Sequence, residues 1–146
     1  MEERKYCHYT FSTYNRKFVL NDRDIKCNLE KWFRDIAKDK QFEIISLAIL
    51  SDHVHIPIEQ KANDSPPYIM KCVKGASSHM FFKNYPNTNR CLYRKLWGRS
   101  YYFQEVDPSE LKNVVYYIKN QTAASGADKR FIGKVKKEPR RLASGS

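Results

Sequence analysis

Two strand-like segments separated by only two residues constrain the fold of this chain most. Residues 41–50 (QFEIISLAIL) form an apolar run, and residues 53–60 (HVHIPIEQ) form a second one. Parallel neighbouring strands need a connection of about a dozen residues or more. Ser51 and Asp52 have room only for a tight turn, so the two segments are predicted to be antiparallel neighbours in one sheet.

Helices and strands alternate around this hairpin. From residue type and apolar spacing we expect strands at 4–13 and 95–106 and helices at 21–40, 63–84 and 107–121. Ser65 and Asp107, each followed by proline, are typical helix N-caps. The order β-α-β-β-α-β-α predicts an α+β fold of ferredoxin-like type, an antiparallel sheet with helices packed on it.

The length of 146 residues predicts one domain, residues 1–125, followed by a basic tail, residues 126–146, with seven bases and two acids. The N-terminus does not resemble a signal peptide, and no apolar run is long enough to span a membrane. The four cysteines form no CxxC pair, which disfavours a zinc ribbon or a disulfide framework. We therefore expect a cytoplasmic protein with reduced thiols.

The charge and the aromatic content suggest a class of partner. Lysine and arginine total 27 against 16 acids, a net charge of +11, and the chain carries ten tyrosines, eight phenylalanines and two tryptophans. Bases neutralise phosphates and aromatic rings stack on unpaired bases, a combination that suits single-stranded nucleic acid. A basic protein with an aromatic core fits the same numbers, and composition does not separate the two.

Two residues of the segment 53–60 are candidate metal ligands. Side chains alternate along a strand, so His53 and His55 share one face and Val54 points to the other. The two imidazoles could converge on one cation. A pair of surface histidines on a half-buried strand is the alternative reading of the same pattern.

The last predicted helix contributes a second candidate pair. Its apolar stripe consists of Leu111, Val114, Val115 and Ile118. Tyr117 and Gln121 are one turn apart at one margin of that stripe, so a phenol and a carboxamide could face the same cleft. The alternative is a tyrosine at the edge of the core beside a surface glutamine.

Four stretches in this order resemble the single-tyrosine HUH transposases of small insertion sequences that move as single-stranded DNA. They are DHVHI, YIMKCVKGASSHMFFKNYP with its Lys-Gly-x-Ser core, KLWGRSYYFQEV with its Trp-x-Arg-x-Tyr pattern, and YYIKNQ. The resemblance implies cleavage and rejoining of single-stranded DNA through a covalent 5′-phosphotyrosine. It also implies DNA hairpins as partners and a homodimer, in which the tyrosine helix of one subunit could serve the histidines of the other.

Carried over by position, the resemblance makes Tyr117 the nucleophile and His53, His55 and Gln121 the metal ligands. Two neutral imidazoles and an amide oxygen form a mixed site that suits Mg²⁺ or Mn²⁺. Among the bases, the best candidates for contacts with DNA phosphates are Lys74, Lys95 and Arg99, although ordinary solvated charge is the alternative for each.

Two features depart from the family pattern. Pro57 follows the second histidine where aliphatic residues are usual, and because proline donates no hydrogen bond we expect the strand to bulge or end there. The first strand, HYTFSTYNRK (residues 8–17), lacks a Trp-x-Pro-Lys signature, so no DNA contact can be transferred to it.

Three other functions are compatible with parts of the pattern. A repeat-associated HUH nuclease that does not mobilise itself would have the same active site. A non-enzymatic nucleic-acid-binding α+β sandwich would need the charge and aromatic rings but not the histidines. A zinc hydrolase is the weakest alternative, because no HExxH-type helix is present.

Overall fold

The computed structural model describes residues 3–88, 94–124 and 136–137. Its strands are β1 (Arg4–Thr13), β2 (Glu43–Ile44), β3 (Ala48–Ile49), β4 (His53–Lys61), β5 (Trp97–Val106) and β6 (Lys136–Lys137). Its helices are α1 (Arg23–Lys40), α2 (Pro66–Asn84) and α3 (Leu111–Ala124), with short 3₁₀ turns η1 (Tyr14–Arg16) and η3 (Pro108–Glu110).

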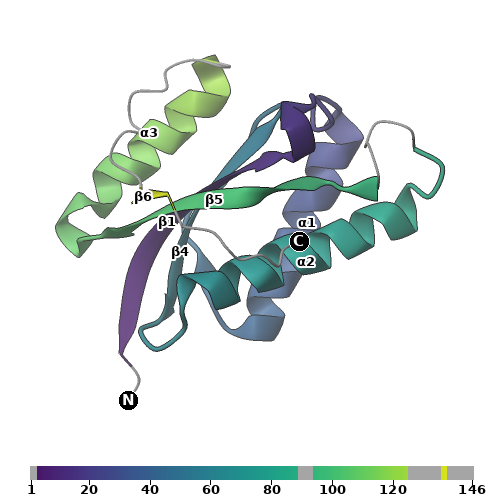
Figure 1. The fold of residues 1–146 in the computed structure, drawn as a ribbon. Coiled ribbons are helices and arrows are strands. Elements are labelled where there is room, and N and C mark those ends of the chain that lie inside the picture. Colours follow the sequence, from purple (N-terminus) through teal and green to yellow (C-terminus); the bar gives the residue numbers. More distant parts are fainter. Residues whose placement is uncertain (1–2, 89–93, 125–135, 138–146) are drawn as a thin grey trace.

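The strands form one antiparallel sheet in the order β2-β4-β1-β5-β6, and β3 also pairs with β4. Figure 1 shows α1 and α2 together on one side of the sheet and α3 on the other. The predicted α+β sandwich is confirmed. The apolar run 41–50 differs in detail, because β2 and β3 are separate two-residue strands that each pair with part of β4.

The C-terminal tail lies mostly outside the described residues, so its predicted boundary at residue 126 stays a prediction. Within it, Lys136–Lys137 pairs with Tyr102 and Phe103 of β5. No helix within the described ranges is both long enough and apolar enough to cross a membrane.

Pro57 neither ends nor bulges β4, so that expectation is wrong. The strand continues to Lys61, and its register with β1 is unbroken on both sides of the proline, which lies opposite His8. The carbonyl of Pro57 accepts a hydrogen bond from Ile45 N, so the imide nitrogen faces the same side. That side holds the irregular segment between β2 and β3, where no ladder bond is required of the proline.

Side chains along β1 and β4 alternate between the two faces of the sheet, and each face has its own buried cluster. Cys7, Tyr9 and Phe11 of β1 are buried with the apolar side chains of β4 against α1 and α2. On the opposite face, a smaller cluster joins the sheet to α3, and it consists of Ala48, Val106, Val114 and Ile118. The even-numbered positions of β1 and the odd-numbered positions of β4 therefore point toward the α3 side.

The Lys-Gly-x-Ser core of α2 packs on the Trp-x-Arg-x-Tyr strand β5. Trp97 Nε1 donates to Ser77 Oγ at 2.9 Å, and that hydroxyl donates to Val73 O at 2.7 Å. Ser77 and Trp97 are both buried. These two motifs therefore fix the position of β5 on the helix layer.

Ser77→Ala tests this contact. The substitution leaves the buried indole N–H of Trp97 without its acceptor, which should lower the free energy of unfolding by about 1–3 kcal/mol. Chemical denaturation measures the change. Ser78→Ala, one residue along the same helix and only half-buried, is the matched control, and an equal loss in both variants would contradict the assigned role.

Candidate active site

Strand β4 places the two histidines on the face that α3 covers. Val54 points into the opposite core, as predicted. His55 is buried, whereas the side chain of His53 keeps 12% of its surface exposed. Their ring centroids are 5.1 Å apart. The two imidazoles therefore lie side by side, with His53 nearer to solvent.

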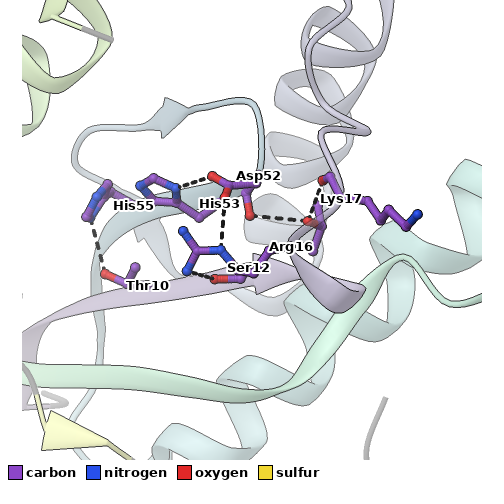
Figure 2. Close-up of polar contacts among 8 residues, drawn as sticks. Thr10, Ser12, Arg16, Lys17, Asp52, His53 and His55 are labelled. Atoms are coloured by element: carbon purple, nitrogen blue, oxygen red, sulfur yellow. Dashed lines mark hydrogen bonds and ion pairs between the residues drawn. The ribbon is translucent and has the colours of Figure 1, made fainter. Parts of the chain in front are cut away.

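His53 is held by the carboxylate of the preceding residue. His53 Nδ1 lies 2.8 Å from Asp52 Oδ1, and Arg16 Nε donates to the other carboxylate oxygen at 2.9 Å (Figure 2). Partial burial by itself raises the pKa of Asp52. The hydrogen bonds from His53 and Arg16 and the charge of Arg16 together lower the pKa by more than burial raises it, so the pKa is below its ordinary value. Asp52 is therefore an ionised acceptor, and Nε2 is the nitrogen through which His53 can ligate.

His55 has neighbours from β1 at its Nδ1. His8 Nε2 lies 3.1 Å from this atom and Thr10 Oγ1 lies 3.2 Å from it. Burial, followed by the nearby charges of His8 and His53, lowers the pKa of His55 to about 2. The imidazole is therefore neutral at physiological pH, which is the form that binds a metal ion.

Helix α3 brings the predicted tyrosine and glutamine to the same face. Val114 and Ile118 anchor the helix on the sheet, with Tyr117 packed at the edge of that cluster. The Tyr117 ring lies edge-on to His55, with centroids 6.4 Å apart. Gln121 Nε2 donates to the Tyr117 hydroxyl at 2.6 Å. A phenol, a carboxamide and two imidazoles from distant parts of the sequence thus form one constellation.

The donor set of this constellation is compatible with a divalent cation. Within residues 3–88, 94–124 and 136–137, no group of three or more His, Cys, Asp or Glu side chains is arranged to hold a metal ion. A site built on His53 and His55 therefore needs a third donor of another type. The amide oxygen of Gln121 is such a donor, and the mixture of neutral nitrogen and oxygen ligands suits Mn²⁺ or Mg²⁺.

The three predicted DNA-binding bases have different surroundings. Lys74 is buried, and its Nζ donates to Gly98 O at 2.7 Å and lies near the rings of Phe11 and Tyr101. Burial lowers its pKa to about 8. This placement favours a structural role for Lys74. Lys95 and Arg99 are exposed, and a phosphate contact by either stays a prediction.

Four residues around the histidines were not assigned to the site from sequence: His8, Thr10 and Asp52, which contact the histidines, and Arg16, which contacts Asp52. The sequence places Asp52 only in the tight turn before His53. The register of β1 with β4 would have identified the contacts from β1, because it places Thr10 directly opposite His55 and Ser12 opposite His53. The pairing of β1 with β4 is long-range, and the sequence alone does not specify its register.

Comparisons with known proteins agree on one family. The model of the family described as "Transposase IS200 like" matches residues 2–121. The ISDra2 transposase TnpA of Deinococcus radiodurans is 29% identical over 99 residues, which cover 67% of this chain and 71% of that protein.

Two solved structures share the fold. A crystal structure of a Deinococcus radiodurans R1 protein described as a transposase superposes with a TM-score of 0.66 at 27% identity, covering 83% of this chain and 93% of that one. A REP-associated tyrosine transposase bound to a REP hairpin superposes with a TM-score of 0.62 at 15% identity, covering 87% and 73%. The chain belongs to the IS200-like transposase family, a family of DNA-cleaving enzymes.

Proposed function

We propose that this chain cuts and rejoins single-stranded DNA at insertion-sequence ends, with Tyr117 as nucleophile and His53, His55 and Gln121 as ligands of a divalent cation. The observation that supports this most is the contact of Tyr117 with both Gln121 and His55 within one chain. The resemblance to the HUH family assigns the same four residues. Mg²⁺ or Mn²⁺ is the proposed cofactor.

The chemistry follows from the nature of a phenol. The Tyr117 oxygen attacks phosphorus, a Tyr–O–P bond forms and the P–O3′ bond breaks. The phenol loses a proton and the departing 3′-oxygen gains one, which leaves a 5′-phosphotyrosine and a 3′-hydroxyl. A 3′-hydroxyl from another end reverses the step, so the bond energy is conserved without ATP.

The surrounding residues orient this step. The hydrogen bond from the Gln121 amide fixes the direction of the Tyr117 hydroxyl and stabilises negative charge on its oxygen. His55 is buried and neutral, so it adds no positive charge beside the Tyr117 oxygen. A bound divalent cation supplies charge neutralisation and polarisation of the scissile phosphate.

Tyr117→Phe tests the nucleophile directly. Loss of the hydroxyl should abolish the covalent protein–DNA adduct formed with labelled single-stranded element ends and Mn²⁺, as measured on denaturing gels. Tyr116→Phe is the matched control, because this neighbouring tyrosine is 70% exposed. An adduct at wild-type level in Tyr117→Phe would show that another residue is the nucleophile.

Metal removal tests the ligand set. Chelation with EDTA should abolish adduct formation, and Mn²⁺ or Mg²⁺ added in excess should restore it. His55→Ala should not be restored at the same metal concentration, since an imidazole ligand is missing. Full activity in EDTA would contradict the metal-dependent mechanism, and restoration by Zn²⁺ alone would assign a different cofactor.

A homodimer is part of the proposal, because closed two-fold dimers are the commonest oligomers and the family resemblance implies one. The structure brings Tyr117 to His55 of the same chain, which favours active sites assembled in cis. Mixing His53→Ala protein with Tyr117→Phe protein should therefore restore no cleavage. Partial restoration would show that α3 is exchanged between subunits, and the separate variants supply the baseline.

A further inference from the structure

The first strand contacts His55 of the proposed metal site directly, and the turn after it reaches His53 through Asp52. In the register of β1 with β4, Thr10 lies opposite His55 and Ser12 lies opposite His53. This is the stretch that departs from the family pattern, residues 8–17, and to which no DNA contact can be transferred. Its contacts within the chain indicate what it does here.

The contacts to His55 come from within the sheet. His8 Nε2 and Thr10 Oγ1 both lie within hydrogen-bonding distance of His55 Nδ1, at 3.1 and 3.2 Å. All three residues are at most 4% exposed. The His55 ring therefore cannot turn without breaking contacts that water does not replace.

The contacts to His53 pass through Asp52. Arg16 Nε donates to Asp52 Oδ2 at 2.9 Å and Arg16 Nη1 donates to Ser12 Oγ at 3.3 Å, while Asp52 Oδ1 lies 2.8 Å from His53 Nδ1. Figure 2 shows Arg16 between Ser12 and Asp52, with the two histidines beyond the carboxylate. Because Asp52 accepts at both oxygens from different directions, its carboxylate has one orientation, and it imposes that orientation on His53.

An unusual backbone turn brings Arg16 to this position. Asn15 and Arg16 both have positive φ angles, 56° and 54°, which residues other than glycine rarely adopt. The turn is held by Thr13 Oγ1, which donates to Lys17 O at 2.7 Å, and by Tyr14 N, which donates to Leu96 O. Strained positions of this kind persist where the surrounding structure determines them, and they cluster at functional sites.

We propose that residues 8–16 position both histidines for metal binding: His8 and Thr10 hold His55, and Arg16 holds His53 through Asp52. At His53 the ionised carboxylate of Asp52 accepts from Nδ1 and so selects the tautomer that presents Nε2, whereas the contacts of His8 and Thr10 at Nδ1 fix the orientation of the His55 ring. Arg16 is a positioning residue, because it acts on the metal site through Asp52. The inference rests on the proposed function in so far as it takes both histidines as ligands.

Arg16→Ala in the full chain separates positioning from charge. Loss of the guanidinium frees the Asp52 carboxylate, so Mn²⁺ affinity, measured by calorimetry without DNA, should fall about tenfold, as is typical when an outer partner of a metal ligand is removed. Charge alone predicts the opposite sign, because removing a positive group near a cation site should strengthen cation binding. In the metal-free protein, ¹⁵N spectra of the imidazoles should show a mixture of tautomers at His53 and no change at His55.

Two further variants complete the test. Arg34→Ala removes an exposed arginine that pairs with Glu30 on α1, and it should change neither readout. Thr10→Val keeps the side-chain volume and should alter the ¹⁵N signals of His55 but not of His53. Thermal unfolding checks that the variants are folded. Arg16→Ala is less prone to misfold than Thr10→Val, because the Arg16 side chain is 60% exposed and Thr10 is buried.

Unchanged Mn²⁺ affinity and unchanged His53 tautomer in Arg16→Ala, relative to Arg34→Ala, would overturn the positioning role. The tautomer measurement needs neither metal nor DNA, so it decides this inference even if Tyr117 is not the nucleophile. Failure of the wild-type protein to bind Mn²⁺ would instead overturn the metal site of the proposed function.

Discussion

The antiparallel register of β1 with β4 is the constraint on which the site depends. It places even-numbered positions of β1 beside odd-numbered positions of β4, so polar side chains from both strands meet on one face. A slip of one residue would move every side chain of a strand to the other face. The buried rings of Tyr9 and Phe11 prevent that slip, since they would lose the core against α1 and α2. Packing on one face therefore fixes hydrogen-bond geometry on the other.

The second interior, between the sheet and α3, is small and partly polar. Its apolar part is limited to a few side chains, and beside them Tyr117 lies against His55 and accepts a hydrogen bond from Gln121. A helix held by so few apolar contacts has a lower local stability than one in the main core. Tyr117 therefore lies on a helix with few apolar contacts, whereas His53 and His55 belong to β4, which is paired on both sides.

The sequence predicted most of the fold because its signals are local. Helical periodicity, the cap at Ser65 and the two-residue turn before His53 are all read within a few residues, and the structure has each of them. Asp107 also caps as expected, but it caps the 3₁₀ turn η3 that leads into α3. The prediction for Pro57 was wrong because a proline disrupts a strand only where the neighbouring strand needs its N–H as a donor. Here the nitrogen of Pro57 faces the irregular segment between β2 and β3. Lys74 was assigned from its charge, and only the tertiary structure shows the carbonyl that its ammonium group contacts. The same limit kept Arg16 and Asp52 out of the predicted site.

The electrostatics of the constellation explain why these long-range partners matter. The proposed ligands are all neutral, so they would not neutralise the charge of a bound cation, and that charge would act on the incoming phosphate. Asp52 is an acidic group in contact with His53, and an unengaged carboxylate there would compete for the cation and repel the DNA backbone. Its pairing with Arg16 cancels the charge, while its contact with His53 retains the orienting effect. One ion pair at the rim of the site therefore lets an acidic residue position a ligand without becoming one.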